Sequence, residues 1–142
     1  MKTVQQLLDR KGRDVVTIGP EASVFDALTL MAEKGIGALL VTESDKPVGL
    51  ISERDYARKV ILKGHTSKEL KVADIMTRRV ICARPDETLE ECMAVMTDKR
   101  VRHLPVLENG NVAGLVSIGD LVKAIIAEQQ FVIEQLENYV SG

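Results

Sequence analysis

The sequence predicts an α+β fold of two similar halves, each built as strand–helix–strand–strand–helix. Short apolar stretches typical of strands alternate with amphipathic helical stretches, and this pattern repeats without a gap after 65 residues. Between residues 14–63 and 79–128, 12 of 50 aligned positions are identical, where unrelated sequences give about 3. One such unit leaves a sheet face bare, so we expect the halves to pack sheet to sheet about a pseudo-two-fold axis.

The composition is typical of a soluble globular protein. The chain has 142 residues, 28% charged side chains and a formal net charge of −2, so nothing favours nucleic acid or an anionic membrane. Aromatic residues make up 3% and Trp is absent, which removes the stacking platforms of single-strand nucleic-acid binders. The start has no apolar signal segment and no apolar run approaches 18 residues, which predicts a cytoplasmic protein without a membrane span.

The pattern along the chain predicts five segments. They are an N-terminal helix over 1–13, a first repeat over 14–63, a linker over 64–78, a second repeat over 79–128 and a C-terminal helical extension over 129–142. In the N-terminal helix, Val4, Leu7 and Leu8 share one face, which we expect to pack on the module or on a partner subunit.

Within the first repeat, the elements follow from capping and turn residues. Ser23 and Gly35 bracket an apolar helix over 24–34, and the continuous apolar run 36–41 predicts a buried strand. A tight turn at 43–46 leads into a strand over 47–52 and a helix over 55–63, and a short strand at 15–18 precedes them all. The second repeat follows the same order.

The helical run 121–139 carries more apolar residues than one small half needs to cover its sheet. Two arrangements satisfy such a surplus. The later part of the helix packs on another subunit, as in a two-fold dimer, or it folds back across its own module.

The most informative stretch is Gly49-Leu50-Ile51-Ser52-Glu53-Arg54-Asp55, with its copy at 114–120. Each copy reads as a strand running into a helix, with Ser and Asp three residues apart. One interpretation is a helix-capping box, in which Ser and Asp satisfy two unpaired backbone N–H groups. The other is a ligand site, because a helix N-terminus suits a phosphate and a carboxylate suits two sugar hydroxyls.

Other chemistry is not indicated. Cys82 and Cys92 have neither a CxxC spacing nor nearby histidines, which predicts reduced packing residues rather than a metal site or a disulfide. The sequence contains no nucleophile elbow, no Walker loop and no ligand-spaced His/Cys cluster. We therefore expect a protein that is not an enzyme and that has no catalytic cofactor or metal.

The chain resembles the CBS domain, named after cystathionine β-synthase. The resemblance rests on VVTIGP, GIGALLV and GLISERD in the first repeat, on DIMT between the repeats, and on RHLPV and GLVSIGD in the second. These motifs occur in order over residues 14–128, so the chain is similar to a stand-alone tandem CBS pair. The resemblance implies a regulatory module that binds an adenosine-containing ligand such as AMP, ADP, ATP, NAD or S-adenosylmethionine. It acts on an unidentified partner or through its own oligomer, here a homodimer. The alternatives are a structural or nucleic-acid-binding CBS protein and, less favoured, an enzyme.

The resemblance also implies roles for particular residues. By position in the motif, Asp55 and Asp120 hold the ribose, and Ser52 and Ser117 hold the ribose or the α-phosphate. The candidate phosphate donors are Arg54, Arg58, Arg100, Arg102 and His103. The candidate adenine slot is lined by Thr17, Ile18 and Ile36 in the first half and by Cys82, Ala83, Val101 and Pro105 in the second. For each of these adenine residues a plain core role is the simpler interpretation.

The two copies differ in charge around the shared frame. Arg54 stands where the second copy has Gly119, and Arg100 and Arg102 stand where the first copy has Gly35 and Gly37. We therefore expect two sites that are not equivalent, and a preference for ligands that carry phosphate.

Overall fold

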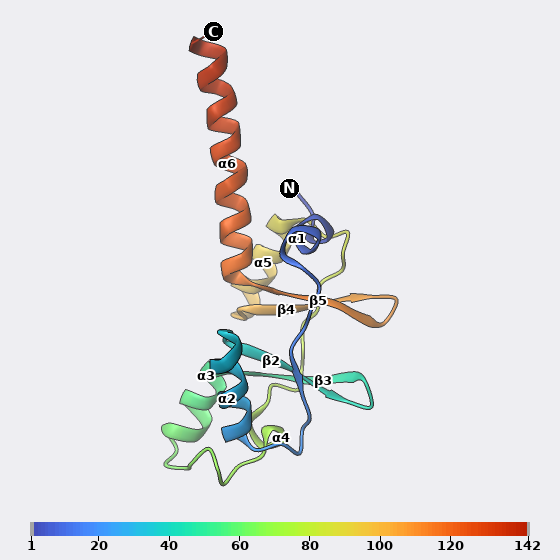
Figure 1. Ribbon diagram of the computed structural model, residues 1–142, viewed down its shortest axis with the longest axis vertical. Helices are drawn as coiled ribbons and strands as arrows, with labels where there is room; N and C mark the ends of the chain where they lie inside the picture. Colours follow the sequence, from blue (N-terminus) through green and yellow to red (C-terminus); the bar gives the residue numbers. More distant parts are fainter. Residues whose placement is uncertain (1, 142) are drawn as a thin grey trace. The chain divides into compact units, whose positions relative to one another are not determined.

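The computed structural model describes residues 2–141, which form two compact units (Figure 1). One unit is a continuous stretch, residues 14–81, and holds the first repeat. The other joins residues 2–13 to residues 82–141 and holds the second repeat. Each unit contains helices and one small sheet, so the mixed fold of two strand-and-helix repeats is confirmed.

The continuous unit is built on a three-stranded sheet in the order β1-β2-β3. Its elements are β1(Thr17–Ile18), α2(Val24–Lys34), β2(Ala38–Glu43), β3(Lys46–Ser52), α3(Glu53–Tyr56), a π-helical turn η1(Ala57–Ile61) and α4(Val72–Ile75). Strand β1 is parallel to β2, and β2 is antiparallel to β3 through a tight turn at Ser44 and Asp45. Both turn residues have positive φ, 52° and 63°, which matches the twist of a two-residue hairpin.

Helix α2 follows its sequence signals. Ser23 caps it by accepting a hydrogen bond of 3.0 Å from the Asp26 backbone N–H, and Gly35 ends it in the left-handed conformation, at φ 65°. The face that includes Val24 and Met31 belongs to the same buried core as β2. The helix expected over 55–63 begins at Glu53 and becomes π-helical at Ala57.

The discontinuous unit has a two-stranded sheet, β4 paired with β5. Its elements are α1(Val4–Lys11), α5(Leu89–Lys99), β4(His103–Glu108), β5(Asn111–Ser117) and α6(Ile118–Ser141). The first strand of this repeat is reduced to one parallel bridge between Ala83 and Val106. Helix α5 ends at Arg100, which adopts the left-handed conformation that Gly35 adopts in the other unit, at φ 56°.

The short helix before each repeat packs in the unit that holds the other repeat. In the discontinuous unit, the N–H of Val4 donates to the Glu87 carbonyl at 2.9 Å. In the continuous unit, the N–H of Val72 donates to the Ala22 carbonyl at 2.8 Å. The two acceptors are equivalent in the repeat, because Ala22 and Glu87 are 65 positions apart. The chain therefore exchanges these helices between its repeats.

A glycine permits each exchanged segment to approach the sheet. A Cβ added at Gly114 would lie 2.6 Å from Leu8 Cδ2, and one added at Gly49 would lie 2.7 Å from Met76 Sδ and 2.9 Å from the Thr77 carbonyl oxygen. All three distances are below van der Waals contact. The repeated glycine of the motif is therefore a packing requirement for the exchanged helix.

The exchange of helices changes the interpretation of residues 64–78 and of α1. Residues 64–78, expected as a linker, include Val72, Ile75 and Met76, which lie in the core of the continuous unit. Because a polar run precedes these residues, the sequence did not indicate that they form a buried apolar face. Likewise Val4, Leu7 and Leu8 of α1 are buried within their own unit, so of the two arrangements expected for this face, packing on the module is the one observed.

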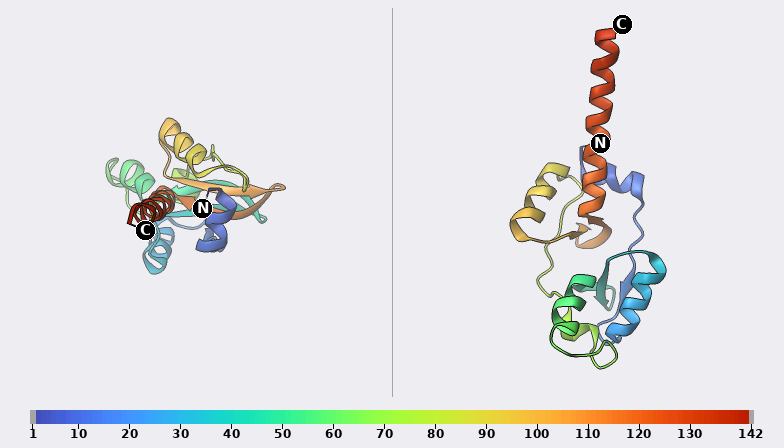
Figure 2. Two further views of the ribbon diagram at one scale, coloured as in Figure 1. Left: turned by 90° about the horizontal axis from the view of Figure 1, so that it is seen from above. Right: turned by 90° about the vertical axis from the view of Figure 1, so that its left-hand side faces the viewer.

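Helix α6 extends past its own unit. Leu121 and Ala124 are buried, whereas the apolar side chains from Phe131 onward are exposed. Figures 1 and 2 show this part running on as a straight extension of the helix. The alternative in which the helix folds back across its own module is therefore not the one observed.

Candidate functional site

In the continuous unit, Ser52 and Asp55 form a reciprocal cap where β3 runs into α3. The Asp55 backbone N–H donates to Ser52 Oγ at 3.2 Å, and the Ser52 backbone N–H donates to Asp55 Oδ2 at 3.0 Å. Ser52 has extended backbone angles, φ −130° and ψ 163°, as an N-cap residue requires. The capping interpretation of the motif is confirmed for this copy.

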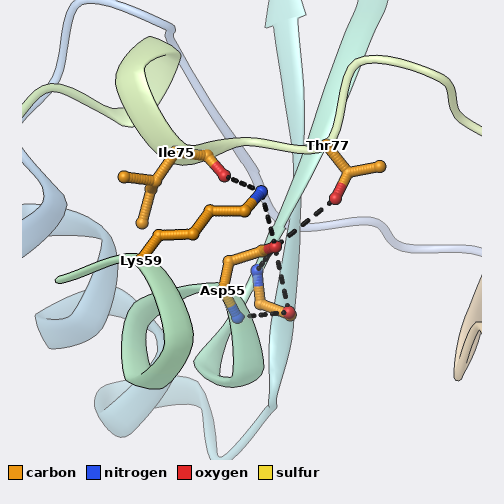
Figure 3. A network of polar contacts seen from close by, with 5 residues as sticks. Asp55, Lys59, Ile75 and Thr77 are labelled. Atoms are coloured by element: carbon orange, nitrogen blue, oxygen red, sulfur yellow. Dashed lines mark hydrogen bonds and ion pairs between the residues drawn. The ribbon is translucent and has the colours of Figure 1, made fainter. Parts of the chain in front are cut away.

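The other carboxylate oxygen of Asp55 faces a lysine and a threonine (Figure 3). Lys59 Nζ lies 3.2 Å from Asp55 Oδ1 and donates a 2.8 Å hydrogen bond to the Ile75 carbonyl. Thr77 Oγ1 lies 3.4 Å from the same Oδ1. Lys59 belongs to the π-helical turn, a feature that is frequent near functional sites. The Asp55 side chain keeps 14% of its surface exposed.

In the discontinuous unit, Ser117 and Asp120 form the same pair at the start of α6. The Ser117 N–H donates to Asp120 Oδ2 at 2.9 Å, and the Asp120 N–H donates to Ser117 Oγ at 3.1 Å. Here the lysine comes from the far end of the chain. Lys11 Nζ lies 2.5 Å from Asp120 Oδ2 and 2.6 Å from the Leu115 carbonyl oxygen.

This environment sets the charge of Asp120. Partial burial raises the pKa of the carboxyl group, but the hydrogen bonds from Lys11 and Ser117 outweigh it, so the pKa lies below its usual value. The carboxylate is ionised at neutral pH and is 25% exposed. Both repeats therefore present a partly exposed carboxylate that is held by its cap and by a lysine bridged to a backbone carbonyl.

His103 faces the same end of the sheet, because it pairs with Ser117 across β4 and β5. Burial lowers the pKa of His103, and the charges of Lys11 and Arg102 lower it further against the opposing effect of Asp120. The ring is therefore neutral near pH 7 and offers a ligand a neutral hydrogen bond. The first repeat has Ala38 at this position, so only one copy carries the imidazole.

The four arginines suggested as phosphate donors are all exposed. Arg54 and Arg58 lie in the continuous unit, on α3 and η1, and Arg100 and Arg102 lie in the other unit, at the end of α5 and before β4. Arg102 is close enough to His103 to lower the pKa of its ring.

The seven suggested adenine residues differ in how much surface they offer. Thr17 is exposed, and Ile18, Ile36, Cys82 and Val101 are half-buried. Ala83 and Pro105 are buried and hydrogen-bonded to each other through their backbones, at 2.9 Å. At these two positions the core role accounts for the residue.

A cavity of about 300 Å³ opens beside Asp120 and was not expected from the sequence. Its lining consists of Leu7, Arg10, Lys11, Asp120, Lys123, Ala124 and Ala127. Sequence reasoning missed Arg10 and Lys11 because they lie outside the duplicated stretch. Lys11 and Asp120 are 109 positions apart, and no local signal pairs them.

Two further properties concern the described residues as a whole. Within residues 2–141, no group of three or more His, Cys, Asp or Glu side chains could hold a metal ion, and no helix is long and apolar enough to cross a membrane.

Cys92 is buried, which raises the pKa of its thiol to about 11, with a further contribution from Glu87 and Glu91. Burial also raises the pKa of the Cys82 thiol.

Comparison with known proteins gives a consistent result. The model of the CBS domain matches residues 8–62 and 72–127. A CBS domain-containing mitochondrial protein of Arabidopsis thaliana, CBSX3, is 36% identical over 99% of this chain and 72% of its own length. A solved CBS domain structure is 53% identical, with a TM-score of 0.85 over 88% of this chain and 98% of the other.

A third relative was solved with ligands. This CBS domain pair, in complex with 5′-methylthioadenosine and S-adenosyl-L-methionine, is 25% identical, with a TM-score of 0.76 over 87% of this chain and 98% of its own. The duplicated motif, the exchanged helices and these matches lead to one conclusion: the chain belongs to the CBS domain family and carries two CBS domains.

Proposed function

We propose that this protein is a regulatory module that binds an adenosine-containing nucleotide at the strand-to-helix junction of its repeats. The observation that carries the proposal is the junction itself. In each repeat, a Ser–Asp pair holds a partly exposed carboxylate at the start of a helix. A carboxylate accepts hydrogen bonds from two neighbouring sugar hydroxyls, and a helix N-terminus favours a phosphate. A relative with the same fold binds two adenosine compounds.

The cap and the ligand role are compatible. Asp120 uses Oδ2 for Ser117 and Lys11, and a carboxylate offers about four acceptor positions on its two oxygens. A ribose can therefore bond the same side chain while the helix stays capped. Thr17, Ile18, Ile36, Cys82 and Val101 keep some surface exposed and remain the candidates for the adenine contact.

Binding measurements on carboxylate variants test the proposal. Calorimetry with AMP, ADP, ATP, NAD and S-adenosylmethionine identifies the ligand, and Asp55→Ala and Asp120→Ala are then compared with it. Loss of the ribose bonds should weaken binding by about 1–3 kcal/mol at the affected site, and loss of the cap should lower stability by only about 1 kcal/mol. Asp98→Ala, on an exposed face of α5, is the matched control. Unchanged affinity at both sites in the folded double variant would contradict the ribose role.

The regulatory output requires that binding favours one state of the protein or of its complex. We therefore expect binding without turnover of the nucleotide. Product analysis after prolonged incubation checks this point, and hydrolysis at a catalytic rate would contradict it.

The same proposal includes a homodimer formed through α6. Val122, Ile126, Ile133, Leu136 and Val140 are exposed and follow the alternating spacing of three and four residues that forms a coiled-coil seam, with Gln129 between them. One seam position holds the β-branched Ile126, Ile133 and Val140, and the other includes Leu136, a combination that favours two strands. A second copy of this helix is thus a complementary partner for the face.

Light scattering at micromolar concentration tests the dimer. Ile133→Asp and Leu136→Asp place charges in the seam and should convert a dimeric mass to a monomeric one. Glu134→Gln, beside the seam, should leave the mass unchanged. A monomeric mass for the unmodified protein would rule this assembly out.

A further inference from the structure

The cavity beside Asp120 carries an excess of positive charge. Arg10, Lys11 and Lys123 line it, and Asp120 is its one acidic lining residue. Within residues 2–141, neither Arg10 nor Lys123 forms an ion pair, and the carboxylate of Asp120 is already engaged by Lys11. Three cations around one carboxylate repel one another, and a bound anion relieves that repulsion.

The shape of the cavity suits part of a small molecule. Its volume of about 300 Å³ is at the lower end of the range of ligand pockets. Leu7, Ala124 and Ala127 provide an apolar wall, and the cations lie on both helices that enclose it, α1 and α6. A site with an apolar wall and convergent cations on one side fits a ligand with a sugar or base at one end and a phosphate at the other.

Lys11 connects this cavity with the motif. Its ammonium group bonds both Asp120 Oδ2 and the Leu115 carbonyl, so it occupies the carboxylate to which a ribose would bind. The flexible four-carbon stem of lysine lets the charge turn toward a neighbouring anion. A ribose bound to Asp120 would leave this ammonium group able to turn toward a phosphate.

We propose that Arg10, Lys11 and Lys123 form a phosphate-binding site that completes the nucleotide site of the second repeat. The inference rests on the proposed function and specifies its ligand class as a nucleotide with an anionic phosphate. In the first repeat, the lysine that holds the carboxylate, Lys59, comes instead from the helical turn that follows Asp55 itself. An excess of cations also disfavours S-adenosylmethionine, whose sulfonium is positively charged.

Calorimetry with adenosine, AMP, ADP and inorganic tripolyphosphate tests the inference on the full chain. The unmodified protein should bind AMP and ADP at least about tenfold more tightly than adenosine. The double variant Arg10→Gln/Lys123→Gln should lose about 10- to 100-fold in AMP affinity, since each charge-assisted contact contributes about tenfold. Its adenosine affinity should stay within about twofold. Lys99→Gln, with a neighbouring aspartate as its ion-pair partner, is the matched control and should change neither.

The possible failures are distinguishable. If adenosine binds and the double variant keeps the full preference for AMP, the phosphate site is overturned while the proposed function stands. If the unmodified protein binds no nucleoside or nucleotide, the proposed function fails, and tripolyphosphate then decides. Saturable tripolyphosphate binding that the double variant abolishes supports an anion site for free phosphates, and no binding overturns it. Both substitutions are at exposed positions, and a thermal unfolding curve verifies the fold. If the double variant is unstable, the single variant Lys123→Gln replaces it in the same binding measurements.

Discussion

The two repeats share one backbone frame but secure its central carboxylate in different ways. In the first repeat, Asp55 is held by Lys59, four residues further along the same helical segment. In the second, Asp120 is held by Lys11, from a helix 109 positions earlier in the chain. A local contact forms wherever the helix forms, whereas a distant one forms only when the exchanged helix docks. The comparison shows how a duplication keeps its geometry while its two sites diverge in chemistry.

The largest effect should come from removing the side chain that anchors α1. Leu8 is fully buried and lies over Gly114, so Leu8→Ala should lower the free energy of unfolding by about 2–5 kcal/mol. Urea unfolding followed by circular dichroism measures it. Leu62→Ala removes the same atoms from a side chain that is 78% exposed, and its effect should be within about 0.5 kcal/mol. Equal effects would mean that α1 is not part of the folded unit.

The two motif glycines should differ when each is replaced by alanine. At Gly49 the added methyl group meets the Thr77 backbone oxygen at 2.9 Å as well as Met76, whereas at Gly114 it meets the end of the Leu8 side chain. Backbone yields less than a side chain, so Gly49→Ala should lower the free energy of unfolding by about 2–3 kcal/mol and Gly114→Ala by about 1–2 kcal/mol. The same urea experiment ranks them, and the reverse order would contradict the packing described.

The effect on stability of replacing Lys11 should differ from that of replacing Lys59, in size and in its dependence on pH. The pKa of Asp120 is lowered in the folded state, so its ion pair contributes stability above the unfolded value, near 3.8, and loses it as pH falls through the folded value. Both groups of the pair are partly exposed, which limits the effect of Lys11→Met to about 0.5–1 kcal/mol at pH 7.

Thermal unfolding between pH 2 and 7 measures this difference. The difference in stability between Lys11→Met and the unmodified protein should disappear below about pH 3.8. Lys59→Met should have the smaller effect at pH 7, about 0.3–0.5 kcal/mol, as for a helical pair four residues apart. A gap that persists at pH 2 would show that Lys11 acts through packing and not through charge.

A small effect of opposite sign should come from the end of α5. Arg100 adopts φ 56°, where the first repeat has Gly35, and left-handed backbone is strained for a residue with a side chain. Arg100→Gly should raise the free energy of unfolding by about 0.5–1 kcal/mol, offset in part by the greater freedom of glycine when unfolded. The reciprocal Gly35→Arg should lower it by about 1 kcal/mol, and a thermal melt compares the two.

Much of the fold was predictable because its signals are local. The exact 65-residue repeat, the Ser23 cap and the Gly35 terminus together predicted α2 and its copy, and the Ser-x-x-Asp spacing predicted the two caps. The exchange of helices was not predictable, because α1 and α4 carry ordinary amphipathic patterns that do not say which sheet they cover. The π-helical turn after Tyr56 was not predicted for a similar reason, since its sequence has the periodicity of a regular helix.

The residues of the candidate site also separate into those that local sequence signals identify and those that only the folded structure brings together. Residues inside the duplicated motif, such as Asp55 and Asp120, could be identified because the repeat marks them twice. Arg10 and Lys11 could not, because they are brought to Asp120 by a contact between distant segments. His103 was identified by position, but its lowered pKa arises from burial and from the charge of Lys11, which only the folded structure reveals.

The exchange of helices also orders events during synthesis. Residues 14–81 are continuous, so they can fold as soon as they leave the ribosome. Helix α1 is made before this unit but can dock only after β5 and the start of α6, up to Asp120, have been made. Synthesis from residue 82 to Asp120 takes roughly 2 to 8 s at 5–20 residues per second. During that interval the apolar face of Val4, Leu7 and Leu8 is uncovered. The Ser117–Asp120 junction is therefore completed later than the Ser52–Asp55 junction, and until then the apolar face of α1 is open to a chaperone or a protease.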